Sequence, residues 1–203
     1  MAETRRSTED RQAELIDAAL RIIATRGITA LSTRALAAEV GLSTGAIFRH
    51  FATLDALLDG VVERVEAVLA ATYPSDELPP RARLDAFVEA RSTAVGNQLG
   101  ILRLMLSEQF LLALPAQGSA RLEACVQRSR AFVLACLREG QACGAVRSDV
   151  AAEALVPVVM GTVQMLALSG AGVRQRVVEG RRVREGLSTL LRPPQGPGGS
   201  EGG

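Results

Sequence analysis

The sequence predicts an all-α protein. Hydrophobic residues make up 48% of its 203 residues, which is ample for a packed core. Aromatic residues make up only 3%, alanine, leucine and valine abound, and the alternating pattern of a half-buried strand is scarce. Apolar residues recur instead at helical spacing, in segments that glycine and proline separate. We therefore expect about nine to ten helices.

The first predicted helix follows a short polar segment, residues 1 to 7. Ser7 or Thr8 can cap its beginning, and Gly27 can end it. One continuous apolar face should pack across the next two helices and complete a three-helix core. That face consists of Leu15, Ile16, Ala19, Ile22 and Ile23.

The stretch from Ser32 to Phe51 has the pattern of a helix-turn-helix. Ser32 can cap a first helix, and Gly41 suits the left-handed position that ends such a helix. A second short helix can begin at Ser43 or Thr44. The residues expected to face inward are Leu36, Ala37 and Val40 on the first helix and Ile47 and Phe51 on the second.

Several residues of this stretch have side chains suited to DNA. The small residues Thr44, Gly45 and Ala46 begin the second helix, at the end that would enter a major groove. One turn later the sequence offers a phenyl ring, a guanidinium and an imidazole for a base methyl, a base edge and a phosphate oxygen. These three groups belong to Phe48, Arg49 and His50.

The run from about Arg11 to Val65 resembles the DNA-binding domain of the TetR family of bacterial transcriptional regulators. The lead-in helix, Gly27, the helix-turn-helix and the ending Phe48-Arg49-His50-Phe51 are all in register with that family. The resemblance implies phosphate contacts by Thr33 and His50, and base contacts by Arg34, Thr44 and Ala46.

Two residues depart from the family pattern. Phe48 stands where the family usually has a tyrosine that also contacts the DNA backbone, and Leu54 stands where a lysine is common. Thr53 can still cap the next helix and offer its N–H groups to a phosphate. The predicted DNA-binding residues are Thr33, Arg34, Ser43, Thr44, Gly45, Ala46, Phe48, Arg49, His50 and Thr53.

The charge of the chain is low for a protein that binds DNA. The net charge is +1, and residues 1–52 carry seven arginines against six acidic residues. A DNA footprint must therefore come from the local arrangement of charges, and we expect non-specific binding to be weak and sensitive to salt.

The residue types argue against an enzyme. All 23 basic residues are arginines, which excludes a P-loop lysine and a Schiff-base lysine within this chain. The single histidine, His50, lies inside the DNA motif, and no HExxH, CxxC or GxGxxG is present. We expect no enzyme activity and no cofactor. The remaining alternative to a regulator is a helical interaction protein, or one that organises DNA without a transcriptional ligand response.

Further apolar helices follow the motif. A connecting helix is expected over 53–72, and the prolines between Tyr73 and Pro80 mark a turn. The predicted domains are 1–52 for DNA binding and 53–192 for regulation and dimerisation, with a disordered tail over 193–203. The helices expected after the turn are 81–95, 98–114, 118–142, 150–170 and 173–191.

The segment from Ala154 to Val173 holds twenty residues without a charge, so a membrane span has to be weighed. Pro157, Gly161 and the polar residues of this segment, with no aromatic belt, favour a buried helix instead. In TetR-like proteins the last long helices form a four-helix bundle between two protomers. We therefore expect a homodimer through the helices at about 118–142 and 150–170.

The cysteines suggest a reducing compartment. Cys125, Cys136 and Cys143 are an odd number in a chain whose amino end lacks an apolar signal segment, so we expect a bacterial cytoplasm. Spacings of 11 and 7 place all three on one helical stripe. A redox or soft-metal site is conceivable, but we favour small buried hydrophobic residues and no metal.

The resemblance also implies a small-molecule effector that releases the protein from its operator, and hence repression. A pocket for such a ligand would be lined by apolar, adaptable side chains with a few amides, although each of these residues can equally be ordinary core. The candidates are Leu102, Met105, Leu106, Gln109, Phe110, Phe132, Met160, Gln164 and Met165.

Overall fold

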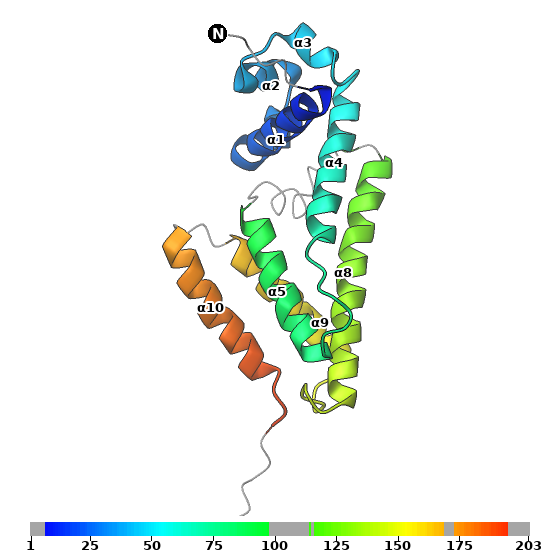
Figure 1. Cartoon of the computed structure of the whole chain (residues 1–203), viewed down its shortest axis with the longest axis vertical. Helices are drawn as coiled ribbons and strands as arrows, with labels where there is room; N and C mark the ends of the chain where they lie inside the picture. Colours follow the sequence, from blue (N-terminus) through cyan, green and yellow to red (C-terminus); the bar gives the residue numbers. More distant parts are fainter. Residues whose placement is uncertain (1–6, 98–113, 115, 169–172, 195–203) are drawn as a thin grey trace, which may run out of the picture. The chain divides into compact units, whose positions relative to one another are not determined.

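The computed structural model describes residues 7–97, 114, 116–168 and 173–194, without the side chains of 95–97, 167, 168 and 173–177 (Figure 1). This part of the chain contains eight α-helices, one 3₁₀ turn and no strand, which confirms the all-α prediction. The helix count is slightly below the nine to ten predicted. The helix expected over 98–114 falls almost entirely outside the described residues.

The chain forms two compact units. The first contains Met1–Ala71 and Ala94–Val126, and the second contains Thr72–Thr93 and Gln127–Gly203. The first unit therefore combines the predicted DNA-binding domain with α4 and the beginning of α8.

Helix α1, Thr8–Arg26, begins with two reciprocal hydrogen bonds. The Ser7 hydroxyl accepts from the Asp10 N–H at 3.0 Å, and the Asp10 carboxylate accepts from the Ser7 N–H at 3.3 Å. The helix ends at Gly27, whose φ of +84° favours glycine. Its core face is almost the predicted one, with Leu15, Ala19, Ile22 and Ile23 buried and Ile16 half-buried.

Helix α4, Leu54–Ala70, completes the core of the first unit. Thr53 caps it by accepting from the Ala56 N–H at 3.1 Å. Gly60 allows α1 and α4 to approach closely, because a Cβ at this position would lie 3.0 Å from Ile16 Cδ1. The pair Arg64–Asp17 joins the same two helices at 3.2 Å. Helix α4 is thus packed directly on α1.

The second unit is built on most of α5 (Pro80–Asn97), on residues 127–142 of α8 (Ala116–Ala142), and on α9 (Ala152–Leu168) and α10 (Val173–Leu190). Its core contains the rings of Tyr73, Phe87 and Phe132, whose centroids lie 5.0 to 5.6 Å apart. The Arg91 guanidinium stacks over two of them, 4.8 Å from the Phe87 centroid and 5.2 Å from that of Tyr73. The aliphatic core consists of Leu84, Val88, Val133, Cys136, Leu137, Val146, Val156, Val159, Val163 and Leu187.

The cysteines do not all behave as predicted. Cys125 and Cys136 are buried, and burial raises the pKa of the Cys136 thiol. Cys143 is exposed, because α8 ends at Ala142 and the chain turns away from the predicted stripe. Among the described residues no group of His, Cys, Asp or Glu side chains could hold a metal ion.

Helix α9 includes most of the uncharged segment, with Pro157 inside its first half. Within the described ranges, no helix has both the length and the apolar character that crossing a membrane requires.

Candidate nucleic-acid interface

The two helices of the predicted helix-turn-helix are α2, Thr33–Val40, and α3, Thr44–Phe48. Each begins at a serine cap: the Ser32 hydroxyl accepts from the Ala35 N–H at 3.1 Å, and the Ser43 hydroxyl accepts from the Ala46 N–H at 3.2 Å. Gly41 ends α2 in the left-handed conformation, with φ of +67°. The Ser32 cap and the Gly41 turn are therefore the ones that the sequence predicts, and α3 begins at Thr44, one of the two predicted starts.

The segment after α3 is fixed by hydrogen bonds from two directions. The backbone N–H groups of His50 and Phe51 both donate to the Ile47 carbonyl, at 2.9 and 3.0 Å. The Gln12 amide of α1 donates to the His50 carbonyl at 3.0 Å. Sequence reasoning missed Gln12, because the two residues lie 38 positions apart and no local pattern links them.

Most of the predicted DNA-binding residues lie at the surface. Arg34, Ser43, Thr44, Gly45, Phe48, Arg49 and Thr53 are exposed, and Thr33 and His50 are half-buried. Ala46, which was expected to touch a base, is the exception. It is buried with 8% exposure next to the core residue Ile47, so its methyl group belongs to the domain core. We therefore leave Ala46 out of the interface.

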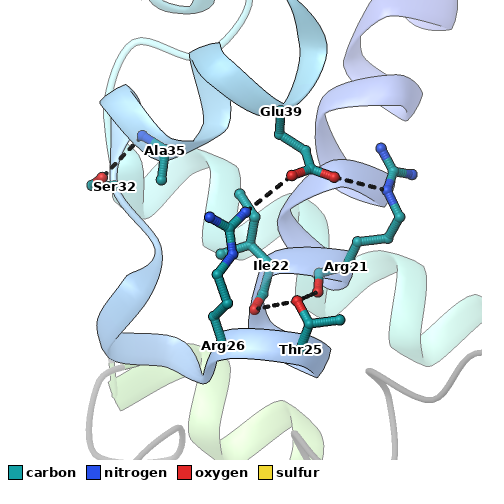
Figure 2. A network of polar contacts seen from close by, with 7 residues as sticks. All are labelled: Arg21, Ile22, Thr25, Arg26, Ser32, Ala35 and Glu39. Atoms are coloured by element: carbon teal, nitrogen blue, oxygen red, sulfur yellow. Dashed lines mark hydrogen bonds and ion pairs between the residues drawn. The ribbon is translucent and has the colours of Figure 1, made fainter.

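The arginines of the N-terminal domain fall into two groups. Arg11 pairs with Glu14 at 2.6 Å, and Figure 2 shows the Glu39 carboxylate between Arg21 and Arg26, at 3.4 and 3.0 Å. These acidic partners hold their arginines within the domain. Over residues 7–52, the two arginines with no ion pair to a described residue are those of the helix-turn-helix itself, Arg34 and Arg49.

The first turns of the helices also differ in charge. The first turn of α1 carries Glu9 and Asp10, and that of α4 carries Asp55, so acidic groups offset the positive ends of both helix dipoles. The first turn of α2 has no acidic residue and carries Arg34 instead. The beginning of α2 is therefore a positive surface that suits a phosphate.

His50 can present only one ring nitrogen to a partner outside the protein. Its Nδ1 atom is buried and has no hydrogen-bond partner in the described part of the molecule. A contact with a phosphate oxygen would therefore have to come from Nε2.

Only some of the residues predicted to line the ligand pocket lie in the part of the chain that the structure describes. Leu102, Met105, Leu106, Gln109 and Phe110 lie outside the described residues. Phe132 and Met160 are half-buried against the core of the second unit, and Gln164 is also half-buried. Met165 is 65% exposed, which does not favour an enclosed position, but its predicted neighbours at 102–110 lie outside the described residues, so its place in a pocket stays a prediction. It lies on the outer side of α9.

Exposed apolar residues gather on the last two helices. Val158 and Met165 on α9 are 44% and 65% exposed, and Val178, Val183 and Leu190 on α10 are 53%, 41% and 59% exposed. Among the described side chains of α8, no large hydrophobic residue is exposed. The sequence-based choice of 118–142 as one half of a dimer face therefore has no exposed apolar surface to support it.

Residues 15–61 match the family model described as bacterial regulatory proteins, tetR family. This match falls inside the stretch that the sequence analysis compares with the TetR family, and it confirms that resemblance. No curated protein matches the chain significantly in sequence.

Solved structures share the fold over nearly the whole chain. One is the ketosteroid transcriptional regulator KstR2 of Mycobacterium tuberculosis, with TM-score 0.79, 20% identity, and coverage of 91% of this chain and 96% of that chain. Another is the TetR family regulator PfmR from Thermus thermophilus, with TM-score 0.74, 20% identity, and coverage of 95% and 100%. A third is AibR in complex with isovaleryl coenzyme A and operator DNA, with TM-score 0.73, 16% identity, and coverage of 91% and 100%.

Proposed function

We propose that this chain, which carries a tetR-family DNA-binding domain on the fold of TetR-family transcriptional regulators, binds a specific operator and represses transcription until a small molecule releases it. The observation that supports the proposal most directly is which arginines of the N-terminal domain form ion pairs. Three of the domain's described arginines are held by carboxylates, whereas Arg34 and Arg49 are exposed on the helix-turn-helix with no such partner among the described residues. Such cations are what DNA phosphates and guanine edges attract.

The contacts can be assigned by position. Thr33 and the start of α2 would hold one phosphate, and His50 Nε2 another. Arg34, Thr44, Gly45, Phe48 and Arg49 would face the bases of a major groove. Ser43 and Thr53 would contribute the beginnings of α3 and α4, because each caps its helix at an exposed position.

A homodimer would present two such domains to two half-sites. We place the dimer face on α9 and α10, which contact each other and carry the exposed valines, Met165 and Leu190. Exposed apolar side chains gathered on neighbouring helices are typical of a surface that another protein covers. In a dimer, two copies of the short helix α3 would contact two half-sites of the operator, so the contacts of both copies add to the affinity.

A ligand would release the protein from DNA by shifting the equilibrium between a conformation that binds DNA well and one that binds it poorly. One protein of this fold, AibR, has been solved with isovaleryl coenzyme A and operator DNA. We propose that residues 53–192 of the present chain bind a small molecule in the bacterial cytoplasm, and that the bound state holds α4 and the helix-turn-helix less suitably for DNA. An effector-saturated protein that binds its operator as tightly as the free protein would contradict this part.

The test begins with selection of the purified protein against random DNA duplexes, followed by a salt titration of binding to the enriched sequence. We expect a palindrome, with a strongly negative slope of log affinity against log salt. Absence of enrichment by a folded dimer would instead favour a helical interaction protein.

Two variants then locate the interface. Arg34→Ala should weaken operator binding by roughly tenfold or more and relax the base preference, because a good arginine contact contributes about 1–3 kcal/mol. Arg21→Ala removes the same charge from the same domain, but Glu39 already holds this arginine. The Arg21 variant should therefore keep the wild-type base preference. Equal losses for both variants would assign the effect to bulk charge and contradict the assignment of Arg34.

A further inference from the structure

One ion pair joins α4 to the beginning of α8. Both Nε and Nη2 of Arg121 donate to Oε2 of Glu66, the former at 3.1 Å. The two side chains are 32% and 26% exposed, so water screens this pair less than a fully exposed one. The hydrogen bond from Arg121 to Glu66 raises the pKa of Arg121.

The same two helices are packed closely beside the ion pair. A Cβ on Gly118 would lie 3.5 Å from Val62 Cγ2, so the backbone of α8 comes near the α4 side chains. Leu122 and Cys125 lie one and two turns further along the same face of α8 and are 2% and 3% exposed. The start of α8 is thus a buried part of the unit that contains the helix-turn-helix.

The remainder of α8 belongs to the other unit. Residues 127–142 of this helix contribute Phe132 to the aromatic cluster and Val133, Cys136 and Leu137 to the core there. Within the same unit, the hydroxyls of Ser129 and Tyr73 share a hydrogen bond of 3.2 Å.

We propose that Glu66 and Arg121 are positioning residues for DNA binding: they hold α4 on α8 and thereby fix the helix-turn-helix that precedes α4. This inference rests on the proposed operator binding. The pair acts on the DNA through α4, whose cap Thr53 follows His50 by three residues and whose core face packs on α1.

Glu66 and Arg121 carry opposite charges, so their variants distinguish a positioning role from an effect of net charge. Glu66→Gln removes a negative charge and Arg121→Gln removes a positive one, so an effect of net charge would strengthen DNA binding in the first variant and weaken it in the second. Positioning predicts that both variants bind the selected operator more weakly, by roughly threefold to tenfold. The double variant should bind no more weakly than either single one, because all three lack the same contact. The exchange Glu66→Arg with Arg121→Glu should recover most of the affinity.

The control is a second ion pair of α8. Arg138 donates to Glu153 on α9, and both side chains are more than half exposed. Arg138→Gln makes the same chemical change on the same helix and should leave operator affinity within about twofold of wild type. Thermal unfolding of every variant shows whether the fold is kept, since a purely structural pair would lower the melting temperature without changing the affinity of the folded protein.

The outcomes separate the two proposals. A wild-type protein that selects no DNA sequence contradicts the proposed function. A wild-type protein that selects an operator, with Glu66→Gln and Arg121→Gln showing opposite effects, additive effects or none, overturns the positioning role and leaves the proposed function intact.

Discussion

The surface of α2 and α3 differs from the surface of α9 and α10 in the kind of group that it exposes. The helix-turn-helix presents Arg34, Thr44 and Arg49, while the last two helices present Val158, Met165 and their neighbours on α10. Charged and hydroxyl groups match a phosphate backbone and base edges, whereas apolar groups match a surface that excludes water. The first surface therefore has the groups that the proposed DNA contacts need, and the second has exposed apolar groups, which is why the homodimer face is proposed there.

The difference also appears in how the N-terminal domain distributes its charge. There, acidic residues pair with the described arginines outside the helix-turn-helix, and Glu39 alone holds two of them (Figure 2). Over residues 7–52, this pairing leaves arginine charge available where DNA is expected to bind. On α9 and α10, by contrast, large apolar side chains are exposed alongside charged ones such as Arg181 and Arg182.

The prediction with the largest expected effect places a charge among the exposed apolar residues of α9 and α10. Met165→Asp should weaken dimerisation by about a hundredfold or more, because burying an unpaired carboxylate costs several kcal/mol. Ala135→Asp is the matched control, since Ala135 is exposed on α8. Sedimentation equilibrium over a range of concentrations measures both variants. Dissociation by Ala135→Asp alone would return the dimer face to α8.

A second test asks whether the two regions fold and function separately. A Cβ on Gly140 would lie 2.6 Å from Val146 Cγ2, so Gly140→Ala should lower the free energy of unfolding by roughly 1–3 kcal/mol. Urea unfolding measures the loss. Gly186→Ala, where nothing lies within 4 Å of the added Cβ, should cost nothing. If folded Gly140→Ala protein chose a different DNA sequence, the two faces would not be independent.

A smaller effect is expected from the cap of α2. Ser32→Ala removes the acceptor for the Ala35 N–H and should cost about 1 kcal/mol of stability, whereas Ser32→Gly should cost only a few tenths. The midpoints of urea unfolding compare the two variants. Equal midpoints for Ser32→Ala and wild type would mean that the cap does not stabilise the DNA-binding domain.

The smallest effect concerns the departure of Phe48 from the family pattern. Its ring is 49% exposed on α3, so Phe48→Tyr can present a hydroxyl to a phosphate without disturbing the core. We expect operator binding to tighten by about two- to tenfold, the equivalent of one hydrogen bond of roughly 0.5–1.5 kcal/mol. The salt slope should not change, because a neutral hydroxyl displaces no counterion. Unchanged or weaker binding would place Phe48 against the bases only.

The prediction of Ala46 as a base contact shows where sequence reasoning reached its limit. Ala46 lies between exposed Gly45 and buried Ile47, and a small residue at such a position fits either the DNA face or the core. Met165 shows the converse, because an apolar residue on a helix was assigned to a cavity and lies 65% exposed. Composition does not distinguish a core stripe from an interface stripe, since both need apolar residues at the same spacing.

The sequence by itself determined the helices and their ends. Ser7, Ser32, Ser43 and Thr53 cap their helices as a local reading predicts, and Gly41 ends α2, because capping depends on atoms within a few residues of one another. Only the tertiary structure decided that Glu39 holds Arg21 and Arg26, which carbonyl Gln12 binds and that α4 pairs with α8. These contacts join residues from 13 to 55 positions apart, and partners at such separations are chosen by packing rather than by local preference.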